Sequence, residues 1–251
     1  MSDDPNIQAE ILKLARLLHC QPERLSYLEN VPSLEVRELR EQVTDMLFSA
    51  HVKTLEKLAA ASKLLPVAIT ALIAERAFGP ILTGRMAGLI EPARALAIAE
   101  RLSPQFLAET ACELDPRRTS EVIAGISPEQ ITEIAQVLVA RNDYVTMGQA
   151  VGQLSREALQ SALEVLGDQD LLRAAFVMDA KHRLPELAEL LGTERLIGLI
   201  DVAEAAGLED EATDLLAHLD EAHQAELLAE VAARDEESHR QVLDRLSRIR
   251  S

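Results

Sequence analysis

The sequence has few of the residues from which β-rich proteins build their strands. Its 251 residues include no tryptophan, aromatic residues make up 2% of the chain, and glycine occurs ten times. Hydrophobic residues still amount to 48%, and alanine and leucine, which favour helices, supply most of them. The composition therefore predicts an all-α protein.

Cysteine is also scarce, with only Cys20 and Cys112 in the chain. The two form no C-x-x-C pair and no zinc-finger spacing. Cys112 lies on an apolar helical face, where a buried and unreactive thiol is the usual interpretation. The N-terminal residues lack a basic start followed by an apolar stretch, so no signal peptide is expected and the predicted location is the cytoplasm.

No long uncharged run is present either. The most apolar stretch, residues 64–90, is broken by Glu75, Arg76 and Arg85 and by the pair Gly79–Pro80. A membrane span needs about 20 mostly uncharged residues. We therefore expect a pair of buried helices here and no membrane span.

Basic residues are the minority, with 25 Lys and Arg against 42 Asp and Glu and a net charge of −17. Proteins that bind DNA or RNA present basic patches to the phosphate backbone. No dense Lys/Arg cluster stands out in this sequence, which argues against a nucleic-acid partner.

Half of the ten prolines form a regular series, at positions 80, 92, 104, 116 and 128, each twelve residues after the last. Proline is tolerated at the first position of a helix, and the residue before it then serves as N-cap. Ser103, Asp115 and Ser127 are suitable caps. Ser127 with Gln130 also has the spacing of a capping box. The proline series therefore predicts a succession of short helices.

Similar helix starts continue without proline, at Ser155, Asp168, Thr193 and Asp220. A twelve-residue unit leaves room for a helix of about nine or ten residues, roughly 14 Å long. Helices this short are not stable alone in water. We therefore expect an α-solenoid, a superhelix of helix–turn units of about 12 residues in which each unit packs on the next.

The first 65 residues have a different pattern. Asp4–Pro5 is suited to cap a first helix, and residues 33–65 contain no Gly or Pro and keep apolar residues at helical spacing. We expect an N-terminal helical cap over residues 1–65 and a helical repeat stack over residues 66–251, in one continuous structural unit. A helix that forms a homodimer is the alternative for the N-terminal segment.

The repeats resemble those of a known family. Residues 102–114 (LSPQFLAETACEL), 114–126 (LDPRRTSEVIAGI) and 126–138 (ISPEQITEIAQVL) carry the resemblance. They are similar to the cytoplasmic N-terminal domain of MgtE magnesium transporters and to the repeats of the flagellar motor switch protein FliG. This resemblance, over residues 78–246 at most, implies a regulatory or force-transmitting interaction surface.

No set of residues in the sequence indicates catalysis. The six histidines do not form an HExxH pair, and His218 and His223 are five residues apart, which does not suit a zinc site on one helical face. No phosphate-binding glycine loop or nucleophile elbow occurs. We expect neither an enzyme nor a bound cofactor. If a hard cation such as Mg²⁺ or Ca²⁺ is sensed, the candidate ligands in the acidic C-terminal stretch are Glu209, Asp210, Glu211 and Asp214.

Residues 141–148 (RNDYVTMG) lie outside the twelve-residue pattern. Insertions in solenoids often decorate the binding face. The candidate interaction surface comprises Arg117, Arg118, Arg141, Asn142, Asp143 and Tyr144. An insertion without a ligand is the alternative.

Three functions follow from these patterns. The first is a soluble, non-enzymatic scaffold or regulator that binds another protein. The second is a small-molecule or lipid-binding protein with an apolar cavity between the N-terminal cap and the repeats, near Phe48, Leu72, Ile73, Phe78 and Met86. The third is a regulatory domain that senses a divalent cation.

Overall fold

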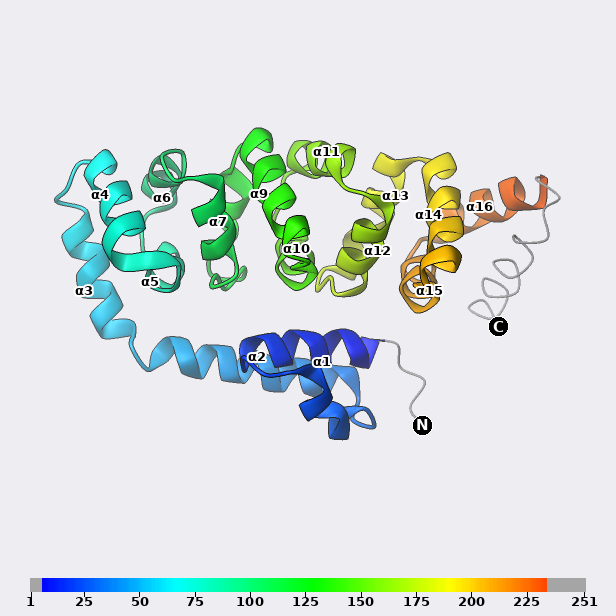
Figure 1. The fold of residues 1–251 in the computed structure, drawn as a ribbon, viewed down its shortest axis with the longest axis horizontal. Helices are drawn as coiled ribbons and strands as arrows, with labels where there is room; N and C mark the ends of the chain where they lie inside the picture. Colours follow the sequence, from blue (N-terminus) through cyan, green and yellow to red (C-terminus); the bar gives the residue numbers. More distant parts are fainter. Residues whose placement is uncertain (1–5, 234–251) are drawn as a thin grey trace.

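The computed structural model describes residues 6–233 and confirms the all-α class (Figure 1). Every regular element within these residues is helical. Three predicted features lie outside the described residues. They are the helix cap at Asp4–Pro5, the histidine at position 239 (His239), and the end of the repeat region, which was predicted to reach residue 251.

The elements follow one another with short connections. They are α1 (Asn6–Leu17), η1 (Pro22–Leu28), α2 (Ser33–Ser49), α3 (Val52–Ser62), α4 (Val67–Ile73), η2 (Ala74–Phe78), α5 (Gly79–Ala87), α6 (Pro92–Ala99), α7 (Pro104–Ala111), α8 (Ser120–Gly125), α9 (Pro128–Ala140), α10 (Tyr144–Val151), α11 (Arg156–Val165), α12 (Asp168–Phe176), η3 (Lys181–Arg183), α13 (Leu184–Leu191), α14 (Thr193–Ala206), α15 (Glu209–Ala217) and α16 (Glu221–Ala233).

Helices α4 to α16 form an elongated stack (Figure 1). Most helices in it pack on the second helix along the chain: α5 contacts α7, α7 contacts α9, α9 contacts α11, and α12 contacts α14. One continuous core cluster extends from Ala71 in α4 to Leu227 in α16. Each short helix is thus stabilised by burying its apolar face against its neighbours, as expected for helices of this length.

Four members of the proline series begin helices as predicted. Pro80, Pro92, Pro104 and Pro128 lie at the first or second position of α5, α6, α7 and α9. The predicted caps Ser103 and Ser127 also make the expected hydrogen bonds.

Ser103 Oγ accepts a hydrogen bond from the N–H of Phe106, and Ser127 Oγ accepts one from the N–H of Gln130, both at 3.3 Å. The Gln130 side chain donates to the carbonyl of Ala99 instead of closing a capping box with Ser127.

The predicted helix start at Asp115–Pro116 is wrong. Residues 115–119 form a turn, and α8 begins only at Ser120. The Asp115 carboxylate accepts the N–H of Arg117 at 3.1 Å and also binds the guanidinium groups of Arg117 and Arg118. An aspartate that binds the N–H two residues later favours a turn over a helix.

The later helix starts agree with the sequence. Ser155 Oγ caps α11 by accepting the N–H of Ala158, α12 begins at Asp168, and α14 begins at Thr193. Asp220 Oδ1 accepts the N–H of His223 at the start of α16.

Residues 141–148 are not an insertion, however. They contain a short turn and then α10, which packs on α9 and α12 like the other helices of the stack.

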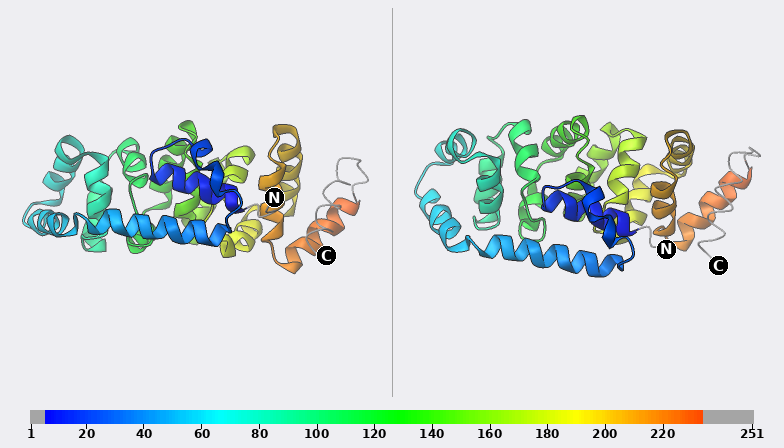
Figure 2. Two further views of the ribbon diagram at one scale, coloured as in Figure 1. Left: turned by 90° about the horizontal axis from the view of Figure 1, so that it is seen from below. Right: turned by 60° about the horizontal axis from the view of Figure 1, so that its bottom comes forward.

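The segment 33–65 is not one helix. It breaks at residues 50–51 into α2 and α3, and α3 packs on α5 at the first end of the stack. We call α1, η1 and α2 (residues 6–49) the arm. The arm folds back along the stack (Figure 2) and has its own small core, which includes Ile7, Ile11, Leu14 and Val36.

Arginine side chains join distant helices at their ends. Arg195 Nη1 and Nη2 donate to the carbonyls of Leu163 and Leu166 at 2.6 and 2.7 Å, and Arg183 Nη1 binds the carbonyls of Val151 and Leu154. Arg94 binds the carbonyls of Ser62 and Leu65 in the same way.

In each case the two carbonyls belong to residues 32 and 29 positions earlier. The last carbonyls of a helix have no partner within that helix. We refer to these contacts as arginine clamps.

The clamps are testable at Arg195. Arg195→Met retains most of the apolar stem but leaves the carbonyls of Leu163 and Leu166 without a donor, so the free energy of unfolding should fall by about 1–3 kcal/mol. The matched control is Arg156→Met, which removes only solvent-exposed ion pairs and should cost less than about 1 kcal/mol. Urea denaturation measures both. Equal losses in the two variants would contradict a special role for the clamp.

Candidate functional site

The arm contacts the middle of the stack through a small apolar cluster. Ala9 of α1 packs with Phe176 and Val177 at the end of α12, and Leu12, Tyr144 and Val145 complete the cluster. Figure 2 shows the arm running beside the stack along much of its length. A contact this small supplies only part of the attachment, and charged groups supply the rest.

A buried set of four charges lies next to this cluster. Lys13 of α1 is 3% exposed and binds both Glu10 and Asp179, the latter at 2.6 Å. Arg40 of α2 binds Glu10 at 3.1 Å and Asp179 at 3.0 Å. Asp179 follows α12 and is the one member of the set that belongs to the stack. Two positive and two negative charges therefore neutralise one another across the contact.

The environment of Asp179 keeps its carboxylate ionised. Burial alone would raise its pKa, but the positive charges of Lys13 and Arg40 more than offset this, and the pKa is held below its ordinary value. Ionisation in turn favours attachment of the arm, because both cations come from the arm. Removal of one partner from a buried ion pair typically costs about 3–5 kcal/mol.

A second polar contact lies at Asp143. Arg16 of the arm donates two hydrogen bonds to its carboxylate, at 2.7 and 2.6 Å. The same carboxylate caps α10 through the N–H of Thr146 and accepts the thiol hydrogen of Cys112 at 3.1 Å. Burial opposes ionisation of Asp143, but the bonds from Arg16 and Cys112 hold its pKa below the ordinary value.

Cys112 is half-buried under this contact. Burial and then the hydrogen bond to Asp143 raise the pKa of the thiol. A thiol that stays protonated is a poor nucleophile, so Cys112 should react slowly while the arm is in place.

The third contact is exposed. Arg117 and Arg118 both bind Asp45 of α2, at 3.1 and 2.8 Å, and the Arg118 guanidinium lies 4.1 Å from the centre of the Phe48 ring. Solvent-exposed pairs such as these contribute little to stability. They place α2 beside the turn at residues 115–119.

Between these contacts, the arm and the stack enclose a cleft of about 770 Å³. Seven of its lining residues are Lys or Arg and four are Asp or Glu, although the whole chain is strongly acidic. The seven cations are Lys13, Arg16, Arg37, Arg40, Arg85, Arg117 and Arg118, and the four acids are Glu41, Glu113, Asp115 and Asp179. Lining residues of the cleft thus have the opposite charge balance to the protein as a whole.

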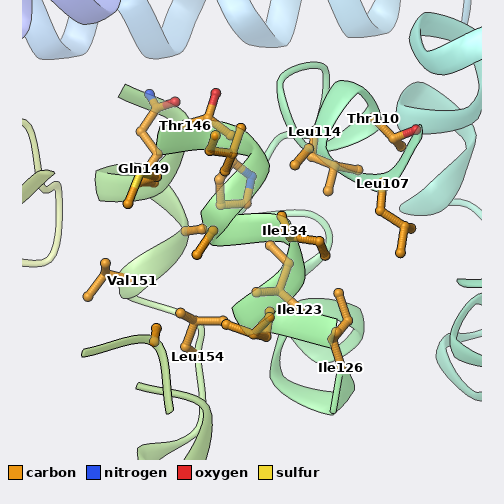
Figure 3. Close-up of a pocket in the computed structure, with 18 of the residues that line it drawn as sticks. Leu107, Thr110, Leu114, Ile123, Ile126, Ile134, Thr146, Gln149, Val151 and Leu154 are labelled. Atoms are coloured by element: carbon orange, nitrogen blue, oxygen red, sulfur yellow. The ribbon is translucent and has the colours of Figure 1, made fainter. Parts of the chain in front are cut away.

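An apolar cavity of about 200 Å³ lies inside the stack, lined by residues of α5 to α13 and their connections. Figure 3 shows Thr146 and Gln149 on the side nearest the arm, and Ile123, Ile126 and Leu154 on the opposite side. Leu114, Pro116 and Gln149 line both the cavity and the cleft. These three residues therefore form a wall that the two spaces share.

Large apolar side chains are exposed mainly on the arm and the first helices. Among the described residues twelve such side chains are exposed, and eleven of them lie between residues 18 and 81. They are Leu18, Tyr27, Leu34, Leu39, Met46, Leu47, Leu64, Leu65, Ile69, Leu72 and Ile81, and the twelfth is Val165.

Leu65, Ile69 and Leu72 lie at helical spacing around the start of α4, the first helix of the stack. The helix packs on α6 on one side, while α3 covers α5. This leaves an apolar face of α4 open at the first end of the stack. We call Leu64, Leu65, Ile69 and Leu72 the end patch.

The residues predicted to form a cavity between cap and repeats are not gathered around one. Leu72 is 51% exposed, whereas Met86 is buried with Leu55 and Phe78 beneath α3. Ile73 is half-buried on the same helix as Leu72, and Phe48 lines the polar cleft. The apolar cavity that the structure does contain lies deeper, within the stack.

The predicted interaction surface makes contacts within the chain. Arg117 and Arg118 bind the arm, and Asp143 is buried beneath Arg16, as described above. Arg141 binds Glu109 at 2.6 Å. Asn142 has a left-handed backbone at the end of α9, and its side-chain oxygen accepts the hydroxyl of Tyr144, which also binds Asp170. Three of the six residues thus hold the arm, Arg141 and Asn142 lie at the turn before α10, and Tyr144 begins α10.

The four candidate cation ligands do not converge. Among residues 6–233, no group of three or more His, Cys, Asp or Glu side chains is placed to hold a metal ion. Asp214 is fully buried and binds Lys181 and His218 instead. Burial lowers the pKa of Lys181, and the negative charge of Asp214 counteracts this. Glu209, Asp210 and Glu211 lie in the first turn of α15.

The run Val67–Ala87, which joins α4, η2 and α5, is long and apolar enough to cross a membrane by length and composition. Its mean hydropathy is 1.3, and 22% of the window is buried inside the structure.

Sequence reasoning missed the buried charges that seat the arm. The available signal is that Glu10 lies on the same helical face as Ile7, Ile11 and Leu14, with Lys13 next to that face. Charged residues within an apolar face are rarely buried unless they are paired. Their partner Asp179 could not be identified, because it is 166 residues away from Lys13.

No family model, no curated protein and no solved structure matches this chain.

The attachment of the arm can be tested through Cys112. In a Cys20→Ser background, Asp179→Asn removes the stack's charge from the buried set, which costs the contact about 3–5 kcal/mol. The arm should then leave the stack more often, and the rate of Cys112 reaction with a thiol reagent should rise roughly tenfold or more.

The matched control is Asp45→Asn, which weakens an exposed contact and should change the rate by less than about twofold. Equal Cys112 rates in the background protein and in Asp179→Asn would contradict the assigned role of Asp179.

Proposed function

We propose that this protein is a protein-binding module that contacts its partner with the end patch. The observation that carries the proposal is the concentration of exposed large apolar side chains on the arm and first helices. Monomeric soluble proteins rarely expose contiguous apolar patches larger than a few hundred square ångströms, and clustered exposed apolar side chains commonly mark an interaction site. The resemblance of the repeats to MgtE and FliG modules points to the same kind of function.

The end patch is suited to a partner because nothing among the described residues covers it. Leu64 is 85% exposed at the connection before α4. In a stack of short helices, each unit buries its apolar face against the next, and the outermost unit is left with an open face. A partner that packs on α4 would continue the stacking.

Charge around the end patch indicates what kind of partner fits. Residues 52–76 contain four Lys or Arg and two Glu, whereas the whole chain carries a net charge of −17. Complementary charge at the rim of an interface speeds association and selects partners. The proposed partner is therefore a protein with an apolar ridge bordered by acidic side chains.

The experiment is capture of the partner from an extract of the source cells by tagged protein. The double variant Ile69→Glu/Leu72→Glu places two charges in the end patch and should reduce capture of the partner by roughly tenfold or more. Because both side chains are exposed, the melting temperature should change little.

The matched control is Val165→Glu, which changes an exposed apolar side chain elsewhere and should leave capture intact. Equal capture by the double variant and the control would contradict the proposal. Two other outcomes would replace the proposed protein partner with a different one. Loss of a dimer in sedimentation would indicate a second copy as the partner, and loss of binding to phospholipid vesicles would indicate a membrane surface.

A further inference from the structure

The apolar cavity inside the stack is large enough to hold a small molecule. Its volume is about 200 Å³, whereas protein interiors contain few voids larger than a water molecule. An apolar cavity of about 150 Å³ in another protein stays dry and binds benzene. By the same scale, this cavity would hold about eight carbon atoms.

The cavity is elongated along the stack. Its lining includes residues of every α-helix from α5 to α13, although α5 and α13 are separated by α7, α9 and α11, which pack in succession (Figure 1). Nine of the lining residues are alanines, whose short side chains leave space between the helices. A space of this volume that touches so many helices suits an extended chain better than a compact ring.

No charged side chain lines the cavity among the described residues. Its walls consist of aliphatic residues, two methionines and one proline, together with the neutral polar residues Thr83, Thr110, Thr146 and Gln149. An ion buried without a counter-charge is costly. The cavity therefore favours neutral ligands over ions.

Two of the polar residues have hydroxyl groups without partners. Thr83 Oγ1 and Thr110 Oγ1 are buried and make no hydrogen bond in the described structure. The two residues belong to helices in close contact, since a Cβ added to Gly84 would come within 3.1 Å of the carbonyl oxygen of Thr110. A buried hydroxyl without a partner is costly, and rotation about χ1 can turn it toward the cavity. A hydroxyl group on a ligand can supply the missing partner at this end of the cavity.

We propose that the protein binds a neutral aliphatic alcohol with one linear chain of about eight carbons. The chain lies in the cavity, and the hydroxyl group binds Thr83 and Thr110 between α5 and α7. The site is distinct from the end patch, since no residue of the end patch lines it. Binding of this ligand does not depend on the proposed protein partner.

The probes are 1-hexanol, 1-octanol, cyclooctanol and octanoate, titrated into the full chain and followed by calorimetry. 1-Octanol should bind saturably at one site, and the affinity should rise about fourfold for each methylene group added between hexanol and octanol. Cyclooctanol has the same number of carbons in a compact ring and should bind roughly tenfold more weakly than 1-octanol, because it does not fit the elongated space. Octanoate should also bind roughly tenfold more weakly or worse, because the cavity offers its charge no counter-charge.

Variants of the cavity wall separate this site from binding at the surface. Ala135→Leu adds three carbon atoms from α9 and should lower the affinity for 1-octanol roughly sixtyfold, which is about fourfold for each carbon displaced. The matched control is Ala93→Leu on the exposed side of α6, which should bind like the wild type. If Ala135→Leu does not fold, Ala150→Leu fills the same cavity from α10.

A second variant tests the position of the hydroxyl group. The double variant Thr83→Val/Thr110→Val keeps the shape of both side chains and removes both hydroxyls. Its affinity for 1-octanol should fall roughly fivefold, because the hydroxyl of the ligand loses its partner. The matched control is Thr132→Val, whose hydroxyl binds the carbonyl of Pro128 outside the cavity, and it should bind like the wild type.

Three results would overturn the proposal. They are the absence of saturable 1-octanol binding, an affinity for cyclooctanol or octanoate equal to that for 1-octanol, and full 1-octanol binding by a folded cavity-filling variant. An unchanged affinity in the double threonine variant would overturn the assignment of the hydroxyl group to Thr83 and Thr110.

Discussion

The contact between most short helices of the stack and the helix two further along is the interaction on which the rest of the structure depends. Helices of 6 to 14 residues cannot persist in water unless their apolar faces are covered. Aliphatic packing supplies most of this cover. The arginine clamps at Arg94, Arg183 and Arg195 add a directional element, since each ties a helix start to the end of a helix some thirty residues earlier. Packing and clamps together set the spacing of the stack.

That spacing determines what the arm can reach. Asp143 and Asp179 lie at helix ends on the same side of the stack, where Arg16, Lys13 and Arg40 of the arm meet them. Because these charges are largely buried, they hold the arm more firmly than the exposed pairs at Asp45 can. The polar cleft lies between the arm and the stack, and it shares Leu114, Pro116 and Gln149 with the inner apolar cavity. The end patch lies on the stack beyond the reach of the arm.

Much of the fold could be predicted from the sequence, because helix starts are specified by residues close together in the chain. Ser103, Ser127 and Ser155 each act on an N–H three residues away, so these cap residues, the first two followed by proline, were enough to locate their helices. Asp115 shows the limit of this reasoning, since its carboxylate is used by Arg117 and Arg118, which also bind the distant Asp45. The candidate site was less predictable. The partners of Lys13 and Arg16 on the stack, Asp179 and Asp143, lie 166 and 127 residues away, and no local pattern specifies such distances.

Hydrogen exchange of the α1 amides in the full chain tests the central claim, that buried charges seat the arm on the stack, most directly. If the arm is seated, the amides from Ile11 to Leu17 should exchange about as slowly as those of α12, and Asp179→Asn should speed exchange of the α1 amides far more than that of the α12 amides. Exchange of the α1 amides that is far faster than that of α12 in the unmodified protein, and insensitive to Asp179→Asn, would contradict the account.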